Sequence, residues 1–294
     1  MALTVLAAVG WLIAVWPRSP SWAVMGAAAL LVGHAWFLAA ELLLLPHVAR
    51  NDPAPLASRR QRLAAWAAET RVALQVFAWR QPFRWRSEAD CLDDARGAGR
   101  TGVVLVHGFL CNRGFWRPWL RRLRADGRAF VAVNLEPPFA SIDDYAPAIH
   151  EAVHRVRRAT GRPPLLVCHS MGGLAARAWL VSCGHAPAGL VRHVVTIATP
   201  HRGTWLARFS RRENGRQMSP DSAWLASLHA ATPCSAAAHF TCWWSNCDNV
   251  VMPPSMATLE GADNRLLPGA AHVDLAFRPE VMEATFALLE QAAE

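Results

Sequence analysis

The chain has 294 residues, which is enough for one large α/β domain with an extension. Its formal net charge is +8, and it contains no lysine, so all 30 strongly basic residues are arginines. They are spread along the chain instead of forming one basic face interleaved with aromatic side chains, which argues against a nucleic-acid-binding protein. The seven cysteines are an odd number without paired spacing, which excludes a disulfide scaffold and favours reduced thiols. A single bridge among Cys234, Cys242 and Cys247 stays possible.

Two apolar runs begin the chain and predict membrane insertion. Residues 2–16 carry no charge, residues 17–21 form a proline-containing turn, and residues 22–45 are apolar apart from His34 and Glu41. The second run is long enough to cross a bilayer, which takes about 20 helical residues. A cleaved signal peptide is disfavoured because no basic segment precedes the first run. We therefore predict a transmembrane hairpin over residues 1–46, with Glu41 near the interface or against the partner helix.

The arginine distribution predicts the orientation of this hairpin. Arg50, Arg59, Arg60 and Arg62 follow the second run, whereas the turn contains Arg18 alone. By the positive-inside rule, the C-terminal domain is then cytoplasmic.

Residues 47–100 are predicted to form an amphipathic helix and a linker. The helix covers residues 56–80 and ends at Pro82, and residues 87–101 form the linker. The apolar side chains expected on or near one helix face are Leu63, Trp66, Val72, Leu74, Val76 and Phe77. This face either rests in the membrane interface or packs on the domain that follows.

Residues 101–294 alternate between strand and helix patterns. The expected strands cover residues 102–106, 129–135, 164–169, 191–199, 240–244 and 265–267, and the expected helices cover residues 116–126, 141–160, 173–182 and 279–291. Such alternation predicts a mainly parallel sheet with helices on both faces. Polar residues follow the strand ends at His107, Ser170, His201 and Asp248, which predicts a site at the carboxyl edge of the sheet.

The stretch PLLVCHSMGGL, residues 164–174, has the pattern of a nucleophile elbow. A short apolar strand ends in a sharp turn centred on Ser170, and Gly172 and Gly173 then open a helix. The glycines allow that helix to pass close to the strand. The usual pattern is G-x-S-x-G, and Cys168 stands here in place of the first glycine. A small residue is what this position requires.

An acid and a base follow Ser170 in the order expected for a Ser, acid, His triad. Asp248 comes after the strand at residues 240–244, and His272 comes after the strand at residues 265–267. Ser170 then attacks a carbonyl, His272 transfers the proton, and Asp248 orients the imidazole. Asp263 is the alternative orienting acid, and Asp274 is too close to His272 in sequence.

The oxyanion of such a reaction needs hydrogen-bond donors. The backbone N–H of Met171, at the start of a helix, is one candidate, and that of Phe109 is the other. His107 and Gly108 follow the buried strand at residues 102–106 and support this assignment. Gly172 is a further supporting residue, since it lets the helix after the elbow pass close to the strand.

Five motifs in order resemble the α/β-hydrolase fold, and specifically bacterial lipases and esterases of the triacylglycerol lipase type. They are VVLVHGF, CHSMGGL, TIATPHRGT, the Asp of SNCDNVVMP and the His of GAAHVDL, and the resemblance runs from about residue 101 to 290. It implies Ser170, Asp248 and His272 as the triad and Phe109 and Met171 as the oxyanion donors, with no cofactor and no metal. The hairpin, which secreted lipases lack, favours an ester substrate at a bacterial inner membrane.

Two segments allow alternative interpretations. Residues 205–238 form either a cap that shapes an acyl-binding pocket or one packed permanently on the core. His201 and Arg202 either contact the substrate or, as their Pro- and Gly-rich turn favours, support the elbow.

Residues 150–154 match H-E-x-x-H, a zinc protease signature, but Arg157 and Thr160 stand where the extended signature has Gly and His. We interpret this segment as a surface crossover helix. The sequence thus favours a membrane-anchored serine hydrolase acting on lipid-like carboxylic esters. The alternatives are an acyltransferase or thioesterase with the same triad, a non-catalytic scaffold of the same fold, and, least favoured, a zinc protease.

Overall fold

Six short segments of the chain pair into one parallel sheet. The computed structural model describes residues 2–93, 97–184 and 189–290. The strands are β1 (Val103–Val106), β2 (Phe130–Val133), β3 (Leu165–His169), β4 (His193–Ile197), β5 (Phe240–Trp244) and β6 (Asp263–Leu266). Their order across the sheet is β2-β1-β3-β4-β5-β6, and each neighbouring pair is parallel. All six predicted strands are confirmed, with bounds that shift by at most two residues.

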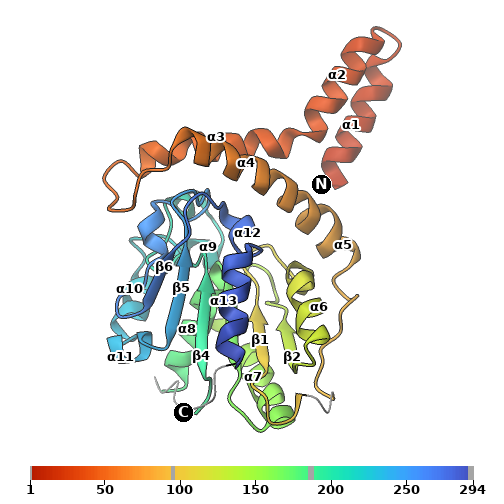
Figure 1. The fold of residues 1–294 in the computed structure, drawn as a ribbon. Coiled ribbons are helices and arrows are strands. Elements are labelled where there is room, and N and C mark those ends of the chain that lie inside the picture. Colours follow the sequence, from red (N-terminus) through yellow and green to blue (C-terminus); the bar gives the residue numbers. More distant parts are fainter. Residues whose placement is uncertain (1, 94–96, 185–188, 291–294) are drawn as a thin grey trace.

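Helices cover both faces of the sheet (Figure 1). They are α6 (Arg117–Ala125), α7 (Ala146–Thr160), α8 (Met171–Ser182) and α13 (Pro279–Glu290). Val106 and Leu174 share one core with α7 and α8, whereas Val167 and Phe286 share the other core with α6 and α13. The strands have two cores because successive side chains of a strand point to opposite faces. The last residue of the predicted helix over 279–291 lies outside the described residues.

Shorter helical elements connect these layers. They are η3 (Arg113–Trp116), η4 (Ile142–Tyr145), η5 (Trp205–Phe209), α9 (Glu213–Gln217), α10 (Ala223–Ala230), α11 (Cys234–Ala237), η6 (Pro254–Ala257) and α12 (His272–Leu275). Within the predicted cap, Leu225 and Leu228 of α10 are buried in the core shared with α8. Much of this segment is therefore packed on the domain. All seven cysteines are unpaired.

The second apolar run is not one helix. It forms α2 (Pro20–Leu31) and α3 (Gly33–Val48), which meet at an angle of 54° around Val32. Residues 22–45 are therefore divided between two helices instead of forming one continuous helix, and Gly33 at the break weakens a continuous helix. Within the described part of the chain, no single helix combines the length and apolar character needed to cross a bilayer, and only the bent pair α2 and α3 together meets that requirement.

The predicted helix over residues 56–80 changes its character halfway. It forms α4 (Arg59–Ala73), a π-helical segment η1 (Leu74–Arg80) and α5 (Gln81–Phe83), which contains Pro82. The prediction of a single apolar face on this helix is wrong, since Val72 and Val76 are buried while Leu63 is 64% exposed. Leu63 and Val72 are nine residues apart, which places them on opposite sides of an α-helix. Residues 94–96 of the predicted linker lie outside the described residues.

Helices α3 and α4 lie side by side across the carboxyl edge of the sheet, and we call this pair the α3–α4 arch (Figure 1). Its inner face forms a third core with the loops after β5 and β6. The members of this core are Leu42, Leu45, Ala49, Ala65, Cys247, Met252 and Ala271. Glu41 belongs to this inner face and is buried, which corrects its predicted position near a membrane interface or against the partner helix.

Gly172 allows α8 to pass close to the end of β1. A Cβ atom at this position would lie 2.5 Å from the carbonyl oxygens of both Val106 and His107. We expect Gly172→Ala to lower the free energy of unfolding by about 1–3 kcal/mol or more, because neither backbone oxygen can move without disturbing the sheet. Chemical denaturation of the purified protein measures this change. Gly10→Ala is the control, since its Cβ would meet no atom within 4 Å, and equal stability losses in both variants would contradict the prediction.

Candidate active site

Ser170 occupies a strained turn between β3 and α8. Its backbone angles are φ 54° and ψ −129°, a combination that non-glycine residues rarely adopt. Its N–H donates to the carbonyl of Ile197, at 2.9 Å, and this bond ties the turn to β4. The side chain therefore projects from a fixed point at the carboxyl edge of the sheet, which is the geometry expected of a nucleophile elbow.

The residues around this turn are packed too closely for larger side chains. A Cβ atom on Gly108 would lie 2.7 Å from Cβ of Ser170, so the loop after β1 passes directly over the serine. Cys168 is fully buried in β3, and burial raises the pKa of its thiol. The cysteine that replaces the first glycine of the motif is thus accommodated inside the core.

Ser170, His272 and Asp248 form a continuous hydrogen-bonded relay. Oγ of Ser170 lies 3.0 Å from Nε2 of His272, and Nδ1 of His272 lies 3.0 and 3.1 Å from the two carboxylate oxygens of Asp248. Asp248 is 1% exposed and also accepts the N–H groups of Val250 and Val251. The three side chains come from three different strand ends, which meet at the same edge of the parallel sheet.

The other two acids considered in the sequence analysis form pairs with arginines and not with His272. Asp263, in β6, accepts a hydrogen bond of 2.7 Å from Arg265. Asp274 lies on α12 beside His272 but pairs with Arg278. Only Asp248, among the carboxylates of the described residues, is hydrogen-bonded to the His272 ring.

The electrostatic surroundings prepare His272 to accept a proton. Burial is the largest single influence and lowers the pKa of this imidazole, but the surrounding carboxylates, of which Asp248 acts most strongly, together raise the pKa above its ordinary value. The carboxylates of Glu69 and Glu41 raise it further. An imidazole whose charged form is stabilised in this way is suited to act as a general base.

The two residues predicted to donate backbone N–H groups to an oxyanion belong to the segments on either side of the Ser170 turn. Met171 is the first residue of α8, so its N–H has no partner within the helix. Phe109 lies in the loop that passes over Ser170. His107 holds this loop, because its Nε2 accepts the N–H of Leu135 at 3.1 Å and its Nδ1 lies 2.9 Å from the carbonyl of Gly108. Burial lowers the pKa of His107 to about 4, which keeps this ring neutral.

The α3–α4 arch also contacts the loop of His272 through Glu69, which the sequence analysis did not single out. This residue of α4 is 2% exposed, and its carboxylate accepts the N–H of Val273 at 2.9 Å and that of Asp274 at 2.8 Å. Burial raises the pKa of Glu69 to about 7, against the lowering effect of these two donors. The backbone directly after His272 is therefore held by a helix from outside the sheet.

Two further contacts hold the backbone of His272 itself. Asn249 accepts the His272 N–H at 3.1 Å and donates to Glu41 of α3 at 2.7 Å. His169 lies 3.1 Å from the His272 carbonyl through its Nε2. The only sequence signal for these partners was a glutamate within an apolar run, because Glu41 and Asn249 are 208 positions apart.

The other polar residues considered in the sequence analysis contact neighbouring strands and helices instead of the Ser170 side chain. His201 is fully buried and lies 2.9 Å from Oγ1 of Thr196, while its carbonyl accepts from Arg177, which supports the elbow as favoured above. His150 of the H-E-x-x-H segment lies beside Trp179 of α8, at 3.4 Å from its indole nitrogen. No group of three or more His, Cys, Asp or Glu side chains within the described ranges is arranged to hold a metal ion.

A cavity of about 420 Å³ opens beside the loop after β1. It is lined by Gln81, His107, Leu110, Cys111, Asn112, Asn134, Leu135, Glu136, Pro138 and Phe139. Leu110 and Phe139 are 58% and 42% exposed, so the rim presents apolar surface to an entering molecule. This cavity lies next to the candidate oxyanion donor Phe109, which also contacts Phe139 through its ring.

Residues 103–288 match the model of the alpha/beta hydrolase family. The chain belongs to this family. The matched segment contains all six strands of the sheet and the Ser170 turn between β3 and α8. A search of curated proteins found no match.

Two solved lipases share the architecture of this α/β hydrolase. The mature form of Bacillus licheniformis lipase BlEst2 is 16% identical, with a TM-score of 0.54 over 65% of this chain and 92% of that lipase. Aspergillus fumigatus lipase B is also 16% identical, with a TM-score of 0.59 over 72% of this chain and 58% of that protein. At these identities the similarity establishes the shared fold.

The contact of Glu69 with the His272 loop predicts a change in the pH profile of Glu69→Gln. Removal of this negative charge lowers the pKa of His272, so the acidic limb of kcat/KM moves to lower pH. The maximal kcat falls by about tenfold, because glutamine has one acceptor oxygen for two N–H groups and the imidazole shifts. Ester hydrolysis measured between pH 5 and 9 checks both effects.

Glu213→Gln is the matched control, since Glu213 is exposed on α9 and the substitution removes the same charge. Because the charges of Glu69 and His272 act on each other, the acidic limb reports the titration of the pair. An unmoved acidic limb in Glu69→Gln would show that this residue acts on folding alone.

Proposed function

We propose that this α/β hydrolase is a membrane-attached serine hydrolase that cleaves carboxylic esters of lipid-like molecules. The observation that carries the proposal is the relay from Ser170 through His272 to Asp248, with both links near 3.0 Å. A hydroxyl hydrogen-bonded to a base that is itself oriented by a buried carboxylate is the arrangement that activates a serine nucleophile.

The reaction follows from the roles that these groups can take. Oγ of Ser170 attacks the ester carbonyl while Nε2 of His272 takes its proton, and the oxyanion accepts hydrogen bonds from the N–H groups of Met171 and Phe109. Collapse of the intermediate breaks the ester C–O bond, and His272 returns the proton to the departing alcohol. A water molecule, deprotonated by His272, then hydrolyses the acyl-serine and restores the enzyme.

An apolar substrate is supported by the surface around the site. Leu110 and Phe139 expose large parts of their side chains at the rim of the 420 Å³ cavity. Apolar side chains exposed next to a polar relay suit a molecule that joins an acyl chain to an ester. Both solved lipases named above have the same fold.

Membrane attachment is supported by the N-terminal hairpin of α1 (Ala2–Val15) and α2, which projects away from the hydrolase domain (Figure 1). Neither helix contains a charged residue. Leu6 and Ile13 of α1 and Trp22 of α2 are each more than 60% exposed. A helical pair that is apolar all round finds its most stable environment in lipid. The arginines that follow the hairpin favour a catalytic domain on the cytoplasmic side of a bacterial inner membrane.

We expect the purified protein to release nitrophenol from short and medium acyl esters and to be labelled by a fluorophosphonate probe. Both signals require the Ser170 nucleophile, so Ser170→Ala should lose them while keeping the wild-type unfolding midpoint. Ser182→Ala, which removes the hydroxyl at the far end of α8, should retain them. Absence of labelling in folded wild-type protein would refute the proposed reaction. Comparison of acyl-chain lengths, followed by extracted lipids, then defines the substrate.

Membrane attachment is tested by flotation with phospholipid vesicles. Leu6→Glu combined with Ile13→Glu should reduce the vesicle-bound fraction more than tenfold, because a carboxylate in the hydrocarbon core costs about 2.5–3.5 kcal/mol. Arg158→Glu is the control, since it changes the net charge by the same two units on an exposed position of α7. Equal flotation of all three proteins would exclude the hairpin as the attachment.

A further inference from the structure

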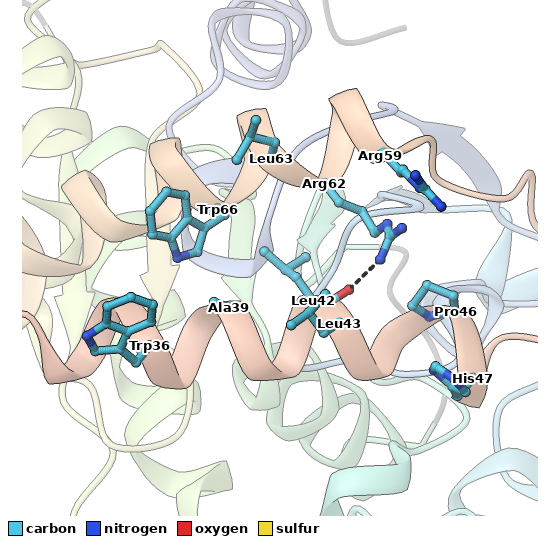
Figure 2. Close-up of a pocket in the computed structure, with 10 residues that line it drawn as sticks. All are labelled: Trp36, Ala39, Leu42, Leu43, Pro46, His47, Arg59, Arg62, Leu63 and Trp66. Carbon is cyan, nitrogen blue, oxygen red and sulfur yellow. Dashed lines mark hydrogen bonds between the residues drawn. The ribbon is translucent and has the colours of Figure 1, made fainter.

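A groove runs between α3 and α4 of the arch, lined by side chains of both helices (Figure 2). Its volume is about 700 Å³. The residues that line it are Trp36, Ala39, Leu42, Leu43, Pro46 and His47 of α3, and Arg59, Arg62, Leu63 and Trp66 of α4. The groove lies outside the segment matched by the family model, which begins at residue 103.

Most of the groove is apolar and open to the surroundings. Trp36, Leu43 and Leu63 are 66%, 67% and 64% exposed, although each is a large apolar side chain. From Trp36 to His47 the groove follows twelve residues of α3, which is roughly 16 Å of helix. A channel of this shape fits an extended hydrocarbon chain better than a compact polar molecule.

One end of the groove is basic. Arg59, Arg62 and His47 lie together near the end of α3, and no acidic side chain lines the groove (Figure 2). Arg62 donates from Nη1 to the carbonyl of Leu42 at 3.2 Å, while its buried Nε has no hydrogen-bond partner among the described residues. Guanidinium groups recognise phosphate oxygens with paired donors. The charge at this end therefore complements a phosphate group.

The groove is formed before any ligand binds. Trp66 of α4 donates from its indole nitrogen to the carbonyl of Ala35 in α3 at 2.7 Å, and Arg62 makes the second link between the helices. The inner face of the arch is fixed by its packing on the loops after β5 and β6. A preformed site loses little conformational entropy on binding.

We propose that this groove binds one anionic phospholipid, with an acyl chain along the apolar channel and the phosphate at Arg59 and Arg62. The site is separate from Ser170 and holds the lipid without cleaving it. A lipid fits better than a second copy of the chain or another protein because the groove combines a narrow hydrocarbon channel with a cationic end. The apolar hairpin of α1 and α2 precedes α3 directly, and tryptophan and arginine side chains favour the headgroup region of a bilayer.

The test uses full-length Ser170→Ala protein in detergent, so that hydrolysis does not consume the probe. Phosphatidylglycerol with a diazirine in one acyl chain is added, and the cross-linked peptides are identified by mass spectrometry. We expect cross-links within residues 36–66, and at least tenfold weaker labelling by the matching phosphatidylcholine probe. Arg59→Gln combined with Arg62→Gln should weaken binding of phosphatidylglycerol by about tenfold or more, because charge-assisted bonds to the phosphate are lost.

Arg60→Gln and Arg50→Gln together form the matched control. They remove the same charge from exposed positions that do not line the groove, and they should leave the affinity within twofold. Inorganic phosphate at millimolar concentration should not displace the lipid, since it lacks the acyl chain. Cross-links confined to the hairpin, equal affinities of the two double variants, or displacement by free phosphate would each overturn the proposal. Dimers that are disrupted by Leu43→Glu would assign the groove to self-association instead.

Discussion

The buried carboxylate of Glu69 connects the N-terminal helices to the centre of the hydrolase site. It is 2% exposed and accepts two backbone N–H groups immediately after His272. Burying a carboxylate is strongly unfavourable unless its oxygens are hydrogen-bonded, and burying the two N–H groups without an acceptor is also unfavourable. Neither partner is therefore stable in its buried position alone. The arch and the loop of His272 depend on each other.

This dependence gives the two faces of the arch different roles. The inner face packs on Cys247, Met252 and Ala271 and supports the loops of Asp248 and His272. The outer face exposes Trp36, Leu43 and Leu63 beside two arginines. Because the arch lies before residue 103, the family match does not include it. In this chain, the hydrolase fold is therefore joined by a helix pair that supports the His272 loop and also presents an apolar groove.

The strands, their order in the chain and the elbow were predictable because each depends on local sequence. Short apolar runs predict buried strands, and Ser170 between an apolar run and Gly172 predicts a sharp turn. The N-terminal predictions were less accurate. Residues 22–45 bend by 54° between α2 and α3, and Val72 of α4 is buried whereas Leu63, on the opposite side of the same helix, is exposed. Hydrophobic periodicity does not report what lies opposite a helix.

By itself, the sequence determined the parallel sheet, the serine turn and the candidate acid and base, since these rest on apolar patterns and on chemistry near strand ends. Only the tertiary structure decided which groups meet. It brought His272 within 3.0 Å of both Ser170 and Asp248, although the chain separates it from them by 102 and 24 positions. It also buried Glu41 and Glu69 against the loops of the site. Contacts across more than 200 positions have no local pattern, because they arise when two separately formed surfaces pack together.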